Sequence, residues 1–179
     1  MFELMVIVIA VLLLWGVFLF NRLVKDRNRV RSAWSDIDVQ LTRRHELIPQ
    51  LVTSVEAYMK HERATLEAVV EMRSRSVSLD EMADKAGVEE QLEAGVHKLI
   101  ALAESYPDLK ANENFIELQN ELVDVEDHLQ YARRFYNGAV KILNTRVETI
   151  PDVIVANTFG FKPAVFFQAG SREAPKVQF

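Results

Sequence analysis

The residues with the greatest capacity for chemistry in this sequence are its four histidines, which stand among 26 aspartates and glutamates. A di-iron centre in a helical bundle requires a Glu-x-x-His pair on each of two helices. No such pair exists, because the residues three positions before the histidines are Thr42, Tyr58, Ala94 and Val125. His61-Glu62 begins like a zinc-protease motif, but Thr65 stands where a second histidine is required.

Two carboxylate–histidine pairs have a spacing that could hold a metal ion, namely Glu93 with His97 and Asp124 with His128. Charged pairs four residues apart are also what a solvated helix face normally shows, and we favour that interpretation. The chain has no cysteine, which excludes disulfides, thiolate metal sites and cysteine nucleophiles together. We therefore predict a protein that is not an enzyme, with no catalytic residue, no cofactor, no metal and no small-molecule substrate.

Some charged residues are expected inside apolar helix faces. On a helical wheel centred on Ile37, three of them fall within about 20° of the apolar line: Arg44, Glu62 and Arg73. An unpaired buried charge costs several kcal/mol, so these residues need a partner, a water-filled seam or another subunit. We favour a buried ion pair that fixes the helix register, and a partner-binding or ligand-binding role is the alternative.

The elements that position these residues are predicted to be helices. One apolar stripe recurs at intervals of three, four or seven residues and comprises Val30, Trp34, Ile37, Leu41, Ile48, Val52, Val55, Met59, Leu66 and Val69. It predicts a single very long helix, with a kink rather than a stop near residues 45–49, because Pro49 removes one backbone donor. A second helix is expected from near residue 79 to Tyr106-Pro107, and a third from about Asn112 to Pro151.

This helix order predicts the partners of Arg44. If the second helix descends and the third climbs, the connection between them lies near the height of residues 45–49. The acidic residues within reach of Arg44 would then be Glu104, Asp108 or Glu113.

The fold class follows from the same pattern. We predict an all-α protein with an N-terminal transmembrane helix, then an up-and-down bundle of three long helices over residues 30–170, with a short C-terminal helical element before Gly160. The last residues, 171–179, are expected to be a disordered tail.

Residues 1–21 are predicted to anchor the chain in a membrane. Every residue from Leu4 to Phe20 is apolar or glycine, and as a helix this run reaches about 26 Å, close to the hydrocarbon thickness of a bilayer. Nothing basic precedes the run and no small-x-small cleavage site follows it, so we favour an uncleaved span over a signal peptide or a buried helix. Between Gly16 and Pro49 there is no glycine or proline, so the span and the bundle helix can be continuous.

A basic juxtamembrane collar, residues 22–29, follows the anchor, and the basic run extends two residues further. Its cationic members are Arg22, Lys25, Arg27, Arg29 and Arg31. Because they flank only one end of the span, we expect the N-terminus outside and the C-terminal domain cytoplasmic, in a bacterial inner membrane. Residues 22–31 carry a net charge of +4 and residues 32–179 carry −8, which favours anionic lipid headgroups as partners of the collar and argues against nucleic acid.

Three segments together resemble the LemA family of membrane-anchored bacterial proteins. They are RNRVRSAWSDIDVQLTRRHELIPQLVTSVEAYMKHE, LIALAESYPDLKANENFIELQNELVDVEDHLQYARRFYNGAVKILNT and FGFKPAVFF. The resemblance implies a single N-terminal span and a helical-bundle domain, and it supplies no biochemical activity. It also implies an analogy with relatives that help to build specialised membranes such as magnetosome vesicles.

The leading functional hypothesis is a non-enzymatic scaffold or adaptor that self-associates or binds other inner-membrane proteins. A lipid- or membrane-shape-responsive protein, acting in membrane biogenesis or envelope stress, is the alternative, and a metal-dependent enzyme comes third. Four aromatic residues near the C-terminus either cap the bundle or form an interaction patch: Phe159, Phe161, Phe166 and Phe167.

Overall fold

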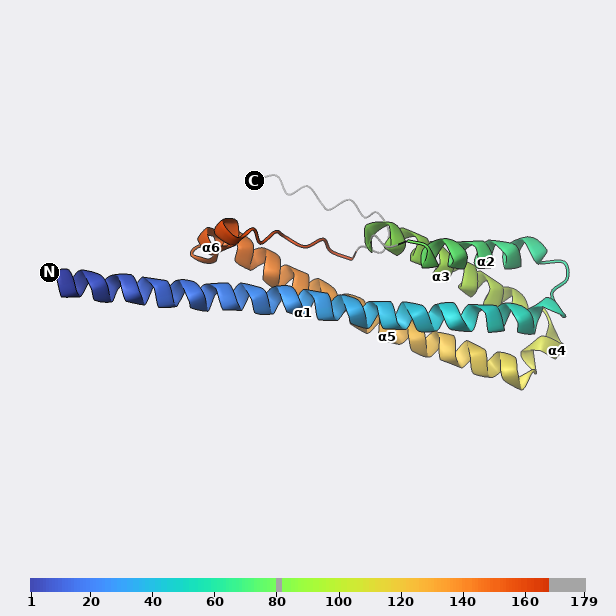
Figure 1. Cartoon of the computed structure of the whole chain (residues 1–179). Coiled ribbons are helices and arrows are strands. Elements are labelled where there is room, and N and C mark those ends of the chain that lie inside the picture. Colours follow the sequence, from blue (N-terminus) through green and yellow to red (C-terminus); the bar gives the residue numbers. More distant parts are fainter. Residues whose placement is uncertain (80–81, 168–179) are drawn as a thin grey trace, which may run out of the picture. The chain divides into compact units, whose positions relative to one another are not determined.

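The computed structural model describes residues 1–79 and 82–167, and within them every regular element is a helix (Figure 1). The elements are α1 (Phe2–Glu56), α2 (Arg63–Val77), α3 (Met82–Ala103), α4 (Pro107–Lys110), α5 (Glu113–Glu148) and α6 (Asp152–Phe159). The predicted all-α fold, with its N-terminal apolar helix and helical bundle, is confirmed. The predicted disordered tail, residues 171–179, lies outside the described residues.

The first helix runs from the apolar segment into the bundle without a break. It passes through Pro49 and ends at Glu56, so the continuity expected between span and bundle is present. The long apolar stripe, however, is divided between α1 and α2. A turn separates the two helices, in which the carbonyl of Val55 accepts the N–H groups of Tyr58 and Met59 at 3.0 and 2.9 Å.

The chain divides into two compact units. Among the described residues, the anchor unit comprises Met1–Ile37 and Tyr131–Phe166, and the bundle unit comprises Asp38–Gln130 with Phe167. Each unit is described by itself below.

The bundle unit contains four longer helical segments, from α1, α2, α3 and α5, that alternate in direction (Figure 1). The antiparallel α2 and α3 approach closely at Gly95, where a Cβ atom would lie 2.9 Å from Met72 Cε. The next helix, α3, runs in the direction of α1, since Lys85 pairs with Asp38 at 3.0 Å and Glu89 pairs with Arg44 further along both helices. The single turn α4 then leads into α5. Fully buried core side chains include Leu41, Ile48, Leu51, Val55, Met59, Leu92, Leu99 and Leu129.

In the anchor unit, α5 packs antiparallel to α1. Arg146 contacts Asp26 at 2.9 Å, and Tyr136 meets the ring of Trp34 edge-on at 6.0 Å. The chain then turns at Pro151 into α6. Its C-terminal Gly160 has a φ of 70°, a left-handed conformation that glycine adopts without a steric penalty. The predicted short helix before Gly160 is therefore present.

Residues 161–166, which we call the strap, run without helical structure alongside α5. The side-chain amide of Asn144 donates to the carbonyl of Ala164 at 2.9 Å and accepts the N–H of Ala164 at 2.8 Å. The hydroxyl of Tyr136 donates to the carbonyl of Val165 at 2.8 Å. The strap is thus held through its backbone.

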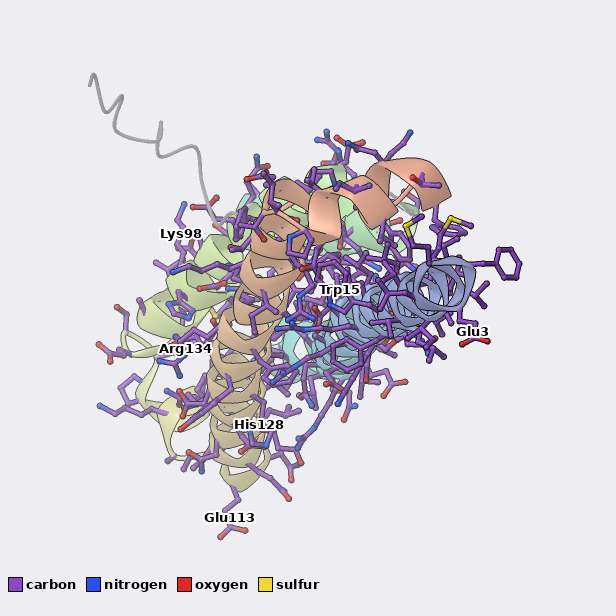
Figure 2. The ribbon with its side chains drawn as sticks, turned by 90° about the vertical axis from the view of Figure 1, so that its left-hand side faces the viewer. Glu3, Trp15, Lys98, Glu113, His128 and Arg134 are labelled. Atoms are coloured by element: carbon purple, nitrogen blue, oxygen red, sulfur yellow. The ribbon has the colours of Figure 1, made fainter. Side chains whose placement is uncertain are left out.

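The N-terminal part of α1 has almost no protein neighbours. Its apolar window is long and hydrophobic enough to cross a bilayer, and only 6% of that window is buried. Glu3 projects outward near the start of the helix (Figure 2). Burial begins at Leu19 and Leu23. Because a core helix of a soluble protein would be covered, this bare apolar helix suggests a membrane anchor.

Candidate functional site

The main polar site is a cluster of charged side chains inside the bundle unit, built around Arg44. This arginine is 3% exposed. Its Nη1 lies 3.2 Å from Oε2 of Glu89, and its Nη2 contacts Glu126 and lies 3.7 Å from Oε2 of Glu93. We call Arg44, His45, Ser76, Glu89, Glu93 and Glu126 the Arg44 cluster. It draws on α1, α2, α3 and α5, and so it ties all four helical segments of the unit together.

Glu89 is fully buried in the cluster, with no exposed surface. Its Oε1 lies 2.6 Å from Nε2 of His45 and accepts the hydroxyl of Ser76. Burial acts to raise the pKa of Glu89, but the hydrogen bonds from His45 and Ser76 and the charges of His45 and Arg44 outweigh it, so the pKa lies below the ordinary glutamate value. The carboxylate is therefore ionised at neutral pH.

Arg73 supplies a hydrogen-bond donor that Pro49 lacks. In an α-helix the N–H of residue 49 would bond to the carbonyl of His45, but proline has no N–H. Nε of Arg73, on α2, donates to that carbonyl at 2.8 Å. The half-buried charge of Arg73 therefore replaces the missing backbone donor and fastens α2 to α1.

A cavity of about 170 Å³ opens on one side of the cluster. Arg44, Glu93 and Glu126 lie in its wall, with His97 and Asp127 at exposed positions beside apolar residues of α3 and α5. Within the described part of the chain, no group of three or more histidine, aspartate or glutamate side chains is arranged to hold a metal ion. The carboxylates instead surround one guanidinium, an arrangement that can fix four helical segments in one register.

The structure places the predicted partners of Arg44 elsewhere. Glu104, Asp108 and Glu113 are all exposed, and Glu113 projects outward from the start of α5 (Figure 2). Glu62 is half-buried and forms the N-cap position of α2. The helix after residue 79 was expected to run antiparallel to α1, but in the structure α2 has that direction. The helix that follows runs alongside α1, and this brings Glu89 and Glu93 to Arg44.

The sequence did contain a signal for the partners that we missed. Glu89 lies three residues before Leu92 and seven before Val96, and Glu126 lies between Leu122 and Leu129 at spacings of four and three. Both glutamates therefore fall on apolar stripes, as Arg44 does. For the hydrogen bond between Arg73 and the His45 carbonyl, the signal is the proline four residues after His45.

The collar and the aromatic residues lie in the anchor unit, apart from Phe167. All five cationic residues of the basic run are exposed. Arg27 stacks over Phe161 at 4.9 Å and Arg29 over Phe135 at 5.2 Å. Of the four aromatic residues, two are buried and two are exposed: Phe161 and Phe167 are the buried ones, and Phe159 and Phe166 the exposed ones.

The rings of Phe159 and Phe161 contact Phe20 at 4.8 and 5.7 Å between centroids. Leu4, at the other end of the apolar run, is exposed. The C-terminal aromatic residues of the anchor unit therefore meet α1 where the predicted span ends.

Sequence similarity to known proteins identifies the family of this chain. The model of the LemA family matches residues 33–179. The chain belongs to the LemA family. A similar protein, "Protein LemA" of Metamycoplasma hominis, is 26% identical over 169 residues, which cover 90% of this chain and 77% of that protein.

Two further relatives of the LemA-family chain are Magnetosome proteins MamQ 1 and MamQ 2 of Paramagnetospirillum magneticum. Each is 31% identical over 71 residues, covering 40% of this chain and 26% of the magnetosome protein. Family membership and the bare apolar helix α1 together indicate a membrane-associated protein.

Proposed function

We propose that this protein is a non-enzymatic scaffold or adaptor, anchored by α1 in a bacterial inner membrane, that self-associates or binds other membrane proteins on the cytoplasmic face. The observation that carries the proposal is an apolar face on α5 of the anchor unit. Tyr131, Phe135 and Ile142 are all exposed there, and at 100° per residue their positions fall within about 40° of one another.

This face is distinct from the one that packs into the unit's core. Tyr136, Val140 and Leu143 of the same helix are buried, and they point about 100–160° away from the exposed residues on a helical wheel. Guanidinium groups lie over two of the exposed rings, with Arg29 over Phe135 and Arg134 4.7 Å above Tyr131. Aromatic rings and arginine are the residues enriched in protein interfaces, which supports a protein partner for this face.

The Arg44 cluster supports a structural role in the same proposal. Its ion pairs and hydrogen bonds link α1, α2, α3 and α5 inside the bundle unit. The binding of a ligand by the cluster, the alternative left by the sequence, would use the cavity beside Glu93 and Glu126.

The proposal is tested by the mass of the full-length protein in nanodiscs and in detergent, measured by light scattering after size exclusion. We expect a protein mass of at least twice the 20.5 kDa of one chain. Substitution of both Tyr131→Ser and Ile142→Ser should weaken association about tenfold, because tyrosine is enriched among the few interface residues whose truncation costs over about 1 kcal/mol.

Val39→Ser is the matched control, since Val39 is as exposed as these residues but lies on α1 of the bundle unit. It should leave the mass unchanged. A monomer in both environments at micromolar concentration, with no co-purifying membrane protein, would rule the scaffold out.

A lipid-responsive protein is the second candidate, and the exposed collar favours it. Five cationic residues remain accessible at the end of the predicted span. A monomeric protein that binds anionic vesicles more strongly than neutral ones would favour this candidate over the scaffold.

A further inference from the structure

The anchor unit carries large apolar side chains on α6 and on the turn before it that are mostly exposed. Ile150 is 84% exposed, Ile154 is 65% exposed and Phe159 is 61% exposed. Such a concentration of exposed apolar surface in one short segment is unusual for a protein surface that faces water, and it points to a contact with an apolar phase.

The position of α6 along the axis of α1 identifies the apolar phase as lipid. The ring of Phe159 lies 4.8 Å from the ring of Phe20, and Phe20 is the last apolar residue before Asn21 and Arg22. If the run from Leu4 spans the hydrocarbon region, its end lies about 26 Å from its start, at the hydrocarbon boundary. The C-terminal end of α6 is therefore at the boundary between acyl chains and headgroups.

The faces of α6 fit this position. Asp152 and Ala156, four residues apart, are buried against the protein. Ile154 lies about 160° from both on a helical wheel, on the opposite face of α6, and Ile150 stands in the turn that precedes the helix. The hydroxyl of Thr158 is satisfied by the carbonyl of Ile154 at 2.8 Å. An interfacial helix buries such a face about 5–10 Å into the boundary region.

Basic residues border α6 at the same height. Arg22, Lys141 and Arg146 line a cavity of about 310 Å³ together with Thr149 and Asp152, the residues on either side of the turn into α6. Cationic side chains that flank an apolar face match the phosphate layer of a bilayer, which lies just outside the acyl chains. Charge and hydrophobicity therefore indicate the same partner, a lipid surface.

We propose that α6, with the turn at Ile150, is a second lipid-contacting element that lies in the membrane interface beside the anchor. Ile150 and Ile154 enter the acyl boundary of the leaflet in which the apolar run of α1 ends, and Phe159 lies at that boundary against Phe20. The proposal rests on the membrane placement of α1 and not on self-association. The anchor unit is then held to the bilayer at two points, the apolar run of α1 and α6, which fixes the rotation of that unit about the axis of the run.

The test uses single-cysteine spin labels, which the cysteine-free sequence permits without background changes. The full-length protein is placed in vesicles of phosphatidylethanolamine and phosphatidylglycerol, and collisions of the label with oxygen and with a water-soluble nickel chelate are measured. Ile154→Cys is the test position and Leu12→Cys, in the middle of the apolar run, is the reference for lipid.

Val165→Cys is the matched control for water. Val165 is 67% exposed, close to the value for Ile154. Its carbonyl accepts the hydroxyl of Tyr136, whose ring meets Trp34. Trp34 lies fourteen residues beyond Phe20, about 21 Å further along α1, which is outside the acyl region.

We expect the label at Ile154 to behave like the one at Leu12, with high oxygen access and little nickel access, and the label at Val165 to show the reverse. Nickel access at Ile154 equal to that at Val165, with Leu12 protected, would overturn the proposal and leave the anchor intact. Nickel access at Leu12 would overturn both. Spin–spin broadening at Ile154 that unlabelled protein dilutes away would mean that a second copy covers α6, and this also overturns the proposal.

Discussion

Single residues in the Arg44 cluster show how buried charge is compensated in this protein. Arg44 contacts three glutamates from two helices, and Glu89 takes additional hydrogen bonds from His45 and Ser76. A buried ion pair is a weak source of net stability, because desolvation offsets the attraction between the charges. Loss of one partner is strongly destabilising, however, because the remaining charges are then buried without compensation.

Adjacent arginines allow this difference to be measured. Arg44→Met should reduce the free energy of unfolding by about 3–5 kcal/mol, because it leaves buried carboxylates without their cation. Arg43→Met should reduce it by at most about 1 kcal/mol, because the ion pair of Arg43 with Asp124 is exposed to solvent. Chemical unfolding of the detergent-solubilised protein, followed by circular dichroism, measures both. Equal losses would mean that the Arg44 cluster is not buried as described.

Arg73 and Pro49 form a pair that a double-mutant cycle can separate. Arg73→Met should cost about 1.5–3 kcal/mol, the range for a hydrogen bond from a charged donor, because the carbonyl of His45 loses its partner. In a Pro49→Ala background the loss should be smaller, since the N–H of alanine can bond to that carbonyl. The comparison uses the same unfolding measurement. The same loss in both backgrounds would contradict the compensation between the two residues.

The lowered pKa of Glu89 predicts acid sensitivity. A carboxylate whose pKa is lower in the folded than in the unfolded state contributes stability that is complete above its ordinary value, 4.5, and is lost as the pH falls through the lower folded value. Thermal midpoints measured from about pH 7 down to about pH 3 should therefore fall less steeply for Glu89→Gln than for the unchanged protein. Glu117→Gln, at an exposed position of α5, serves as control and should retain the original slope.

At the scale of elements, apolar periodicity predicted where most helices lie but not where the first one ends. The segment Ala57–Glu62 contains no glycine or proline, and Met59 is buried in phase with the stripe that continues to Leu66 and Val69. Because the turn keeps the apolar residues on either side of it at helical spacing, the periodic pattern does not reveal the turn. Because that turn reverses the chain, it also reverses the direction expected for α3.

The same turn explains how far the candidate site could be predicted. Arg44 and Arg73 could be recognised as charges on apolar faces, because this depends only on helical spacing within one element. Their partners depend on the direction of neighbouring elements, which the missed turn changed. Glu89 and Glu126 could have been recognised as charges on apolar stripes, but the pairing of either with Arg44 requires the three-dimensional arrangement.

Two glycines in the anchor unit predict opposite effects of the same substitution. At neither glycine does a heavy atom lie within 4 Å of the position that a Cβ would take, so the backbone conformation alone determines the effect of an alanine on stability. Gly160→Ala should destabilise by about 1–2 kcal/mol, because Gly160 has a left-handed conformation that an L-residue adopts at a penalty. Gly138→Ala, inside α5, should stabilise by about 0.5–1 kcal/mol. Thermal unfolding of the two variants checks the sign, and a shift in the same direction would contradict the assigned cap.

At the scale of the whole molecule, charge is distributed unevenly along the chain. The basic run at residues 22–31 carries +4, and residues 32–179 carry −8. Anionic headgroups attract positive and repel negative charge. The basic run is therefore the part of the chain beyond the apolar run that anionic lipid would attract.

Orientation can be determined with single cysteines and a membrane-impermeant maleimide applied to spheroplasts. Glu3→Cys, beyond the outer end of the apolar run, should be labelled in intact spheroplasts. Lys98→Cys, at an exposed position of α3, should be labelled only after lysis. The positive-inside rule gives this expectation because basic residues flank only the C-terminal end of the span. The opposite labelling pattern would place the domain outside the cytoplasm.

The pairing of Asn144 with the strap has a consequence for sequence register. The side-chain amide satisfies both the N–H and the carbonyl of Ala164, so it recognises a peptide unit and not a particular side chain. Any residue with an N–H could in principle occupy that place. The preceding residue is Pro163, which has no N–H to offer. If the strap were shifted by one residue so that Pro163 lay opposite Asn144, the side-chain oxygen of Asn144 would have no N–H to accept. Pro163 therefore excludes that register and favours the observed one, in which Ala164 lies opposite Asn144.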